Sequence, residues 1–175
     1  MRFILIFSFL LLSVYGADKI SKDRVFRCNL DKKPRILVFQ LAQTYVAYDT
    51  HKGTFWKAWK QEGKSGINLT GSVYNQSHGP QPNSLGKTFV EHEKGIEWSL
   101  EGASTKYYSF SPVRKNFTVK CLRKGGSEVA IIEAPLVKGN HLIRTFEIKG
   151  LKKGEKLKLG EFTVTSNGKH QLEVK

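Results

Sequence analysis

Aromatic side chains that can stack on sugar gather in one short stretch, residues 45–59 (YVAYDTHKGTFWKAW). Tyr48 lies on the first arm of this predicted hairpin, Trp56 and Trp59 lie on the second, and Tyr74 follows a little later. Strand residues three apart point to opposite faces unless a bulge intervenes. We therefore expect at least one tryptophan to pack in the core and the outward-facing one to stack on a sugar ring. Core packing of both is the alternative.

The most unusual string is His78-Gly79-Pro80-Gln81-Pro82. Its two prolines fix an extended, semi-rigid backbone that can present His78 and Gln81 at a surface site. A structural loop in which His78 satisfies backbone carbonyls is the competing interpretation. The candidate ligand-binding residues are Tyr48, Trp56, Trp59, Tyr74, His78 and Gln81.

Neither catalysis nor metal binding has a supporting pattern. The five histidines lack tight ligand spacing, and in Glu91-His92-Glu93 a strand would turn the histidine away from both glutamates. Carboxylates for glycoside hydrolysis are present, as they are in any β-protein, but there is no G-x-S-x-G motif. We predict no metal and no cofactor, and we favour a protein without catalytic activity.

The two cysteines are Cys28 and Cys121. An even pair in an oxidising compartment favours a disulfide. Closing a loop of about ninety residues would contribute roughly 4–5 kcal/mol in the chain-entropy model. Two buried thiols are the alternative.

The first sixteen residues predict export. Arg2 precedes a twelve-residue apolar run (FILIFSFLLLSV), and VYG offers a cleavage point before Ala17. The run is too short to span a membrane well. We therefore assign residues 1–16 to a signal peptide and expect the mature protein in the periplasm or outside the cell.

The charge of the chain is strongly positive, with 29 Lys plus Arg against 15 Asp plus Glu and a formal net charge of +14. Most of the cations are lysines, which are hydrated point charges, whereas arginine is usual in forked phosphate recognition. This favours diffuse attraction to anionic polysaccharide or an acidic partner, and not nucleic acid. Charged, solvated strand faces are the plain alternative.

Strand signals dominate residues 17–175, and no window shows sustained helical periodicity. Short β-branched and aromatic runs recur about every eight to twelve residues, which favours an all-β sandwich or barrel, and we predict one antiparallel β-sandwich domain. The run RILVFQLAQ should be buried on both faces or lie centrally in a sheet, and residues 142–147 should alternate between core and solvent. A β-propeller is excluded because the phrase D-x-x-x-G-x-x-W occurs once. Gly53 should take a positive φ in the hairpin turn.

Several strings carry a resemblance to a known group: Lys33-Pro34-Arg35, YVAYD, WKAWK, GSVY and HGPQP. Together they resemble the N-terminal β-domain of secreted bacterial multidomain proteins, commonly joined to a c-type cytochrome or to modules similar to sugar-acting dehydrogenases. The resemblance spans most of residues 17–175 and implies an accessory domain in exported redox or carbohydrate metabolism. It carries over neither haem binding nor catalytic residues.

Our leading hypothesis is an exported, non-catalytic interaction module that binds envelope carbohydrate or a secreted cytochrome or dehydrogenase. A sugar-acting enzyme that uses His78 and nearby carboxylates is the second hypothesis. A structural envelope subunit that self-associates through a sheet edge is the third. The sequence leaves the ligand, the partner and the oligomeric state open.

Overall fold

The protein is built from antiparallel β-strands, as the sequence predicts. The structure, a computed structural model, describes residues 23–68, 82–138 and 141–174, and within them every regular element is a strand. None of these residues belongs to a helix long and apolar enough to cross a membrane. The predicted signal peptide lies outside the described ranges. The strands are β1 (Arg24–Leu30), β2 (Lys33–Leu41), β3 (Thr44–Asp49), β4 (Thr54–Lys60), β5 (Ile67–Asn68), β6 (Asn83–Ser84), β7 (Lys87–Ile96), β8 (Trp98–Leu100), β9 (Ala103–Ser111), β10 (Asn116–Arg123), β11 (Glu128–Lys138), β12 (His141–Lys149), β13 (Leu157–Leu159), β14 (Phe162–Val164) and β15 (Gly168–Val174).

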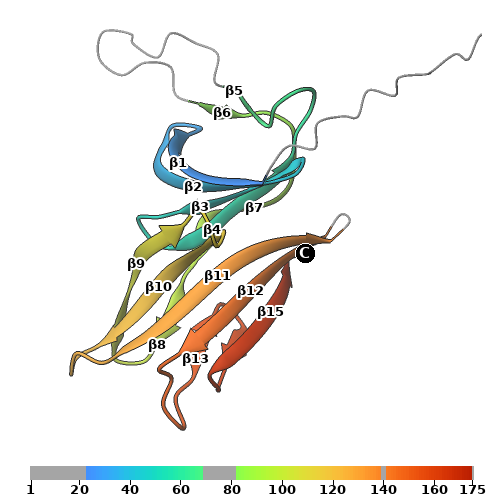
Figure 1. The fold of residues 1–175 in the computed structure, drawn as a ribbon. Coiled ribbons are helices and arrows are strands. Elements are labelled where there is room, and N and C mark those ends of the chain that lie inside the picture. Colours follow the sequence, from blue (N-terminus) through green and yellow to red (C-terminus); the bar gives the residue numbers. More distant parts are fainter. Residues whose placement is uncertain (1–22, 69–81, 139–140, 175) are drawn as a thin grey trace, which may run out of the picture.

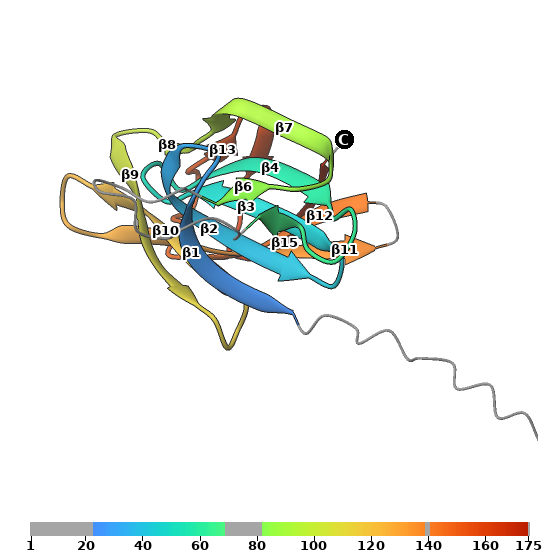
Figure 2. The same cartoon turned by 90° about the horizontal axis from the view of Figure 1, so that it is seen from above.

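Two five-stranded sheets form the sandwich (Figure 1). The first sheet has the order β1-β2-β3-β4-β7, and the second has the order β15-β12-β11-β10-β9. Seen from above, the first sheet lies over the second (Figure 2). A small three-stranded sheet, β14-β13-β8, adds apolar side chains to the same core, and β5 pairs with β6 separately.

The inner faces of both five-stranded sheets share one main core. It combines large aromatic side chains from the first sheet, such as Phe39 and Tyr48, with Phe117 of β10 and Phe146 of β12. The rings of Tyr48 and Phe117 meet across the sandwich with centroids 4.5 Å apart. Contact between aromatic rings of this kind adds to the burial of apolar area that holds the two sheets together.

The outer face of the first sheet is also covered, by a second group of apolar side chains that we call the outer cluster. Ile67 of β5 belongs to it, so the β5–β6 ladder helps to cover this face. As predicted for RILVFQLAQ, β2 is continuously buried from Ile36 to Gln40. The buried members of the outer cluster are Leu30, Ile36, Val38, Tyr45, Ala47, Trp56, Trp59 and Ile67.

The outer face of the second sheet is open to solvent. Burial alternates along β10, β11 and β12, so every second side chain points away from the core. In β12 the inward residues are Leu142, Arg144 and Phe146, and this confirms the alternation predicted for residues 142–147. A strand with one solvated face is the normal result of antiparallel pairing over a single core.

The turn between β3 and β4 confirms the prediction for Gly53, whose φ is 69°. A Cβ placed on Gly53 would lie 2.9 Å from Cγ2 of Val119, a core residue of β10. Glycine therefore serves two purposes here. It permits the left-handed backbone of the turn, and it lets the turn pack closely on the second sheet.

The disulfide between Cys28 and Cys121 is not formed, and both thiols are free. Cys28 packs against the outer cluster, whereas Cys121 lies in the main core, so the first sheet separates them. Burial raises the pKa of both thiols, that of Cys28 to about 11 with help from the charge of Asp31. A side chain that points away from the core cannot bond one that points into the core unless the backbone moves.

Candidate functional site

The predicted aromatic platform lies mostly inside the protein. Tyr48 is 1% exposed in the main core, and Trp59 and Trp56 are 0% and 4% exposed in the outer cluster. The expectation that at least one tryptophan packs in the core is therefore confirmed. Tyr74, His78 and Gln81 lie outside the described residues.

Both tryptophans share one face because β4 contains a bulge. Ala47 pairs with Lys57 and Tyr48 pairs with Phe55, which leaves Trp56 as the extra residue. The pairing of β4 with β7 skips the same position. One extra residue reverses the alternation along a strand, so Trp56 points to the same side as Trp59.

Trp59 has a structural role. Its ring stacks on Tyr45 with centroids 5.3 Å apart, and its Nε1 donates to the carbonyl of Gly66 at 2.7 Å. This bond ties the strand to the segment that leads into β5. No ring face of Trp59 is left for a sugar, because the side chain is fully buried.

A buried lysine fastens the chain around β6 to the first sheet. Nζ of Lys57, 5% exposed as a residue, forms an ion pair with Asp31 and donates to Oγ of Ser84 at 2.7 Å. Ser84 donates its backbone N–H and its hydroxyl to Asp31, each at 2.8 Å, and Asp31 donates its own N–H to the carbonyl of Pro82. Burial alone would raise the pKa of Asp31, but the hydrogen bonds from Lys57 and Ser84 outweigh it and lower this pKa. We call these residues the Asp31 clamp.

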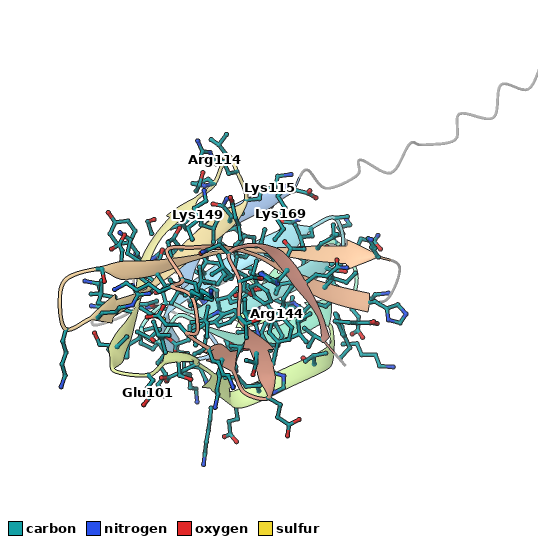
Figure 3. The ribbon with its side chains drawn as sticks, turned by 90° about the horizontal axis from the view of Figure 1, so that it is seen from below. Glu101, Arg114, Lys115, Arg144, Lys149 and Lys169 are labelled. Carbon is teal, nitrogen blue, oxygen red and sulfur yellow. The ribbon has the colours of Figure 1, made fainter. Side chains whose placement is uncertain are left out.

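A second buried ion pair lies inside the main core. Arg144 and Glu133 form a bidentate pair with N–O distances of 2.7 and 3.0 Å, and both side chains are almost completely buried. Burial would lower the pKa of Arg144, but the adjacent carboxylate raises it. Tyr48 packs beside the pair, and burial and the charge of Glu133 raise its pKa. The guanidinium of Arg144 lies 5.4–6.0 Å from the ring centroids of Tyr48, Phe55 and Phe146, so the pair offers no open site. Figure 3 shows Arg144 within the body of the molecule.

An open groove crosses the outer face of the second sheet. Strand register aligns its floor: Ala134 pairs with Thr145, and Thr145 pairs with Gln171. Asn116 begins β10 beside this row, and the neighbouring row aligns Ile132, Glu147 and Lys169. The groove has a cavity volume of about 540 Å³ and is lined by Asn116, Ile132, Ala134, Thr145, Phe146, Glu147, Lys169, His170 and Gln171.

The chemistry of this groove suits hydroxyl groups. Asn116 and Gln171 each carry an amide that both donates and accepts hydrogen bonds, while Glu147 accepts and Lys169 donates. Four strands separated by about 4.8 Å give a row about 14 Å long. The small side chain of Ala134 keeps the middle of the floor low. The arrangement can hold an extended, hydroxyl-rich ligand.

Basic side chains stand on the same side of the molecule. Figure 3 shows Arg114, Lys115, Lys149 and Lys169 together on this side. Two of them have partners, since Lys115 pairs with Asp23 at 2.8 Å and Lys149 with Glu147 at 3.0 Å. The positive charge here can attract an anionic surface over a Debye length of about 8 Å at physiological salt.

Sequence reasoning did not find the groove, although its signal is present. The alternation along β12 places Thr145 and Glu147 on the solvated face. Which residues of β10, β11 and β15 accompany them depends on the register between strands far apart in the chain. No group of three or more histidine, cysteine or acidic side chains could hold a metal ion within the described ranges.

Comparison with known proteins finds no match. No protein-family model, curated protein or solved structure matches this chain. The resemblance to domains of secreted cytochromes and dehydrogenases stays a prediction. The function is therefore argued from the geometry of the site.

Proposed function

We propose that the protein is a non-catalytic accessory module that binds envelope carbohydrate in the groove across its second sheet. The observation that carries the proposal is the alignment of Asn116, Thr145 and Gln171 over four strands around an open cavity. Sugar hydroxyls both donate and accept hydrogen bonds, as amide side chains do. The net charge of +14 supports a first attraction to an anionic envelope.

Retention of the mature protein on a panel of polysaccharides at moderate and at high salt tests this proposal. Hydrogen bonds in a groove should survive salt that screens the lysines, so binding should persist at high salt. Asn116→Ala and Gln171→Ala should each weaken binding about threefold to tenfold, because a hydrogen bond is worth about 0.5–1.5 kcal/mol. Ala134→Leu, which raises the floor, should weaken it more.

Gln43→Ala, an exposed amide in the turn between β2 and β3, is the matched control and should bind like the wild type. Thermal unfolding of each variant verifies that the fold is intact. Retention that disappears with salt, or that ignores the groove variants, contradicts the proposal. Salt-sensitive capture of an acidic secreted cytochrome, with no sugar binding, would favour a redox partner instead.

A further inference from the structure

Three lysines stand in one cross-strand row on the open face of the second sheet, which we call the lysine row. Lys106 of β9 pairs with Lys120 of β10. Ala130 of β11 pairs with Lys120 on one side and with Lys149 of β12 on the other. Burial alternates along β10, so Lys120 points away from the core, and residues paired across strands share its face. Strand register therefore places the three lysines together.

The lysine row borders the groove. In the neighbouring row, Glu147 pairs with Ile132 and with Lys169, and all three of these residues line the groove. Successive rows on one face are two residues apart along a strand, which is a distance of about 7 Å. Figure 3 shows Lys149 and Lys169 on the same side of the molecule. A chain that lies in the groove therefore passes beside the lysine row.

Two of the lysines on this face already have anionic partners. Nζ of Lys120 lies 2.8 Å from a carboxylate oxygen of Glu128 and 3.7 Å from the ring centroid of Tyr108. Nζ of Lys149 lies 3.0 Å from a carboxylate oxygen of Glu147. These two ammonium groups are therefore largely neutralised by the protein itself.

Lys106 and Lys169 have no such partner. Both side chains are exposed, and neither forms an ion pair with any residue that the structure describes. Lys106 stands directly opposite Lys120, and like charges opposite each other on a sheet are unfavourable. An anionic group bound beside Lys106 would offset this repulsion.

The whole face keeps an excess of positive charge after its acidic side chains are counted. Five lysines and three glutamates point outward from the five strands, with the histidines taken as neutral. They are Lys106, Lys120, Glu128, Lys138, Glu147, Lys149, Lys169 and Glu173. In the β9–β10 turn, Asp23 neutralises Lys115 and leaves Arg114 as a further positive charge. This excess suits a ligand with several anionic groups.

We infer that the carbohydrate bound on this face is an acidic polysaccharide, whose anionic groups pair with Lys106 and Lys169 while its hydroxyl groups occupy the groove. The inference rests on the proposed function, because it names the class of carbohydrate for the same face. Five strands about 4.8 Å apart make the face about 19 Å wide. That width fits charges repeated along a chain better than one small anion.

Affinity of the mature protein for two matched pairs of polymers tests the inference. Polygalacturonate and its methyl ester differ in their free carboxylates, and dextran sulfate and dextran differ in their sulfates. The acidic member of at least one pair should bind about tenfold more tightly, because each of two exposed lysines contributes about threefold. The double variant Lys106→Gln with Lys169→Gln should remove this preference and leave binding of the neutral polymer unchanged.

The matched control removes the same amount of charge from another part of the surface. Lys64→Gln with Lys87→Gln changes two exposed lysines, one in the turn after β4 and one on β7 of the first sheet. It should keep the preference of the wild type for the acidic polymer. Thermal unfolding verifies that both double variants are folded.

Several outcomes would overturn the inference: equal affinity for the acidic and neutral members of both pairs, an equal loss in the control double variant, or tighter lysine-dependent binding to phosphatidylglycerol vesicles than to either acidic polymer. Asn116→Ala separates the two proposals. If it weakens binding of every polymer while the lysines have no effect, the inference fails and the proposed function stands. If only the lysines matter, the proposed function fails and the lysine row remains the binding site for the acidic chain.

Discussion

The two five-stranded sheets use the same pairing but are covered differently. The central strands of the first sheet, β2 to β4, are buried on both faces, against the main core and against the outer cluster. The second is buried on one face and presents small and polar side chains on the other. The lesson is that aromatic content and ligand access are separate properties here. The tryptophans and the tyrosine that suggest sugar binding pack in the doubly covered sheet. The open groove is lined instead by amide, charged and apolar side chains and by the hydroxyl of Thr145, which donates to the Ala134 carbonyl.

Removing a tryptophan of the outer cluster should give the largest difference in stability between the two outer faces. Trp59→Ala removes a fully buried ring, its stacking on Tyr45 and its bond to Gly66. We expect a loss of about 3–5 kcal/mol in the free energy of unfolding. Ile132→Ala, on the open face, should cost about 1 kcal/mol or less. Urea unfolding measures both, and equal losses would mean that the two outer faces are not different.

Breaking the buried ion pair should have the next largest effect. Arg144→Met leaves Glu133 buried without its partner, and we expect a loss of about 3 kcal/mol at pH 7. Unfolding by urea measures this loss. Replacement of both partners, Glu133→Leu with Arg144→Met, should restore most of the stability, and no recovery would contradict the argument.

The Asp31 clamp predicts a smaller, pH-dependent effect confined to the first sheet. Asp31→Asn should cost about 1–3 kcal/mol at neutral pH, since it removes hydrogen bonds to a charged group. The pKa of Asp31 is lower in the folded protein than in the unfolded chain, so its ionised carboxylate stabilises the fold above the unfolded pKa of about 4. This stabilisation is lost as the pH falls through the folded-state pKa. The difference between variant and wild type should therefore narrow below about pH 4. Glu97→Gln, in the exposed pair with Lys52, is the control and should change stability by less than about 1 kcal/mol.

The cysteines give the smallest expected change. Cys28 is only half-buried beside the outer cluster, so Cys28→Ser should cost about 1 kcal/mol or less. If a disulfide were present, Cys28→Ser and Cys121→Ser would each lower the free energy of unfolding by roughly 4–5 kcal/mol, because either variant would remove it. Counting free thiols in the unfolded, unreduced protein gives an independent answer. Two thiols per chain are expected.

Local patterns predicted the parts of the fold that depend on a single strand or turn. The positive φ of Gly53 and the alternation around Arg144 both follow from neighbouring residues and are confirmed. The bulge at Trp56 could not be read in advance, because it depends on how β4 registers against both β3 and β7. The side of the sheet that Cys28 faces depends on the register of β1 against β2, which shifts between Cys28 and Leu30.

The groove was beyond sequence reasoning for a related reason. Asn116, Ala134, Thr145 and Gln171 come from four strands, and only the register of three antiparallel pairings puts them in one row. None of these four residues belongs to a local sequence motif that would mark it as part of a site. The hairpin aromatics, in contrast, stand together in the sequence and drew attention to a region that is mostly packed inside.

The short β5–β6 ladder joins two described parts of the chain that are far apart in sequence. Asn68 pairs with Asn83, and Gly66 accepts the N–H of Leu85. Each strand of the ladder is also attached to the first sheet, since Ile67 packs in the outer cluster and Ser84 donates two hydrogen bonds to Asp31. The ladder and the outer face of the first sheet should therefore unfold together, as one cooperative unit.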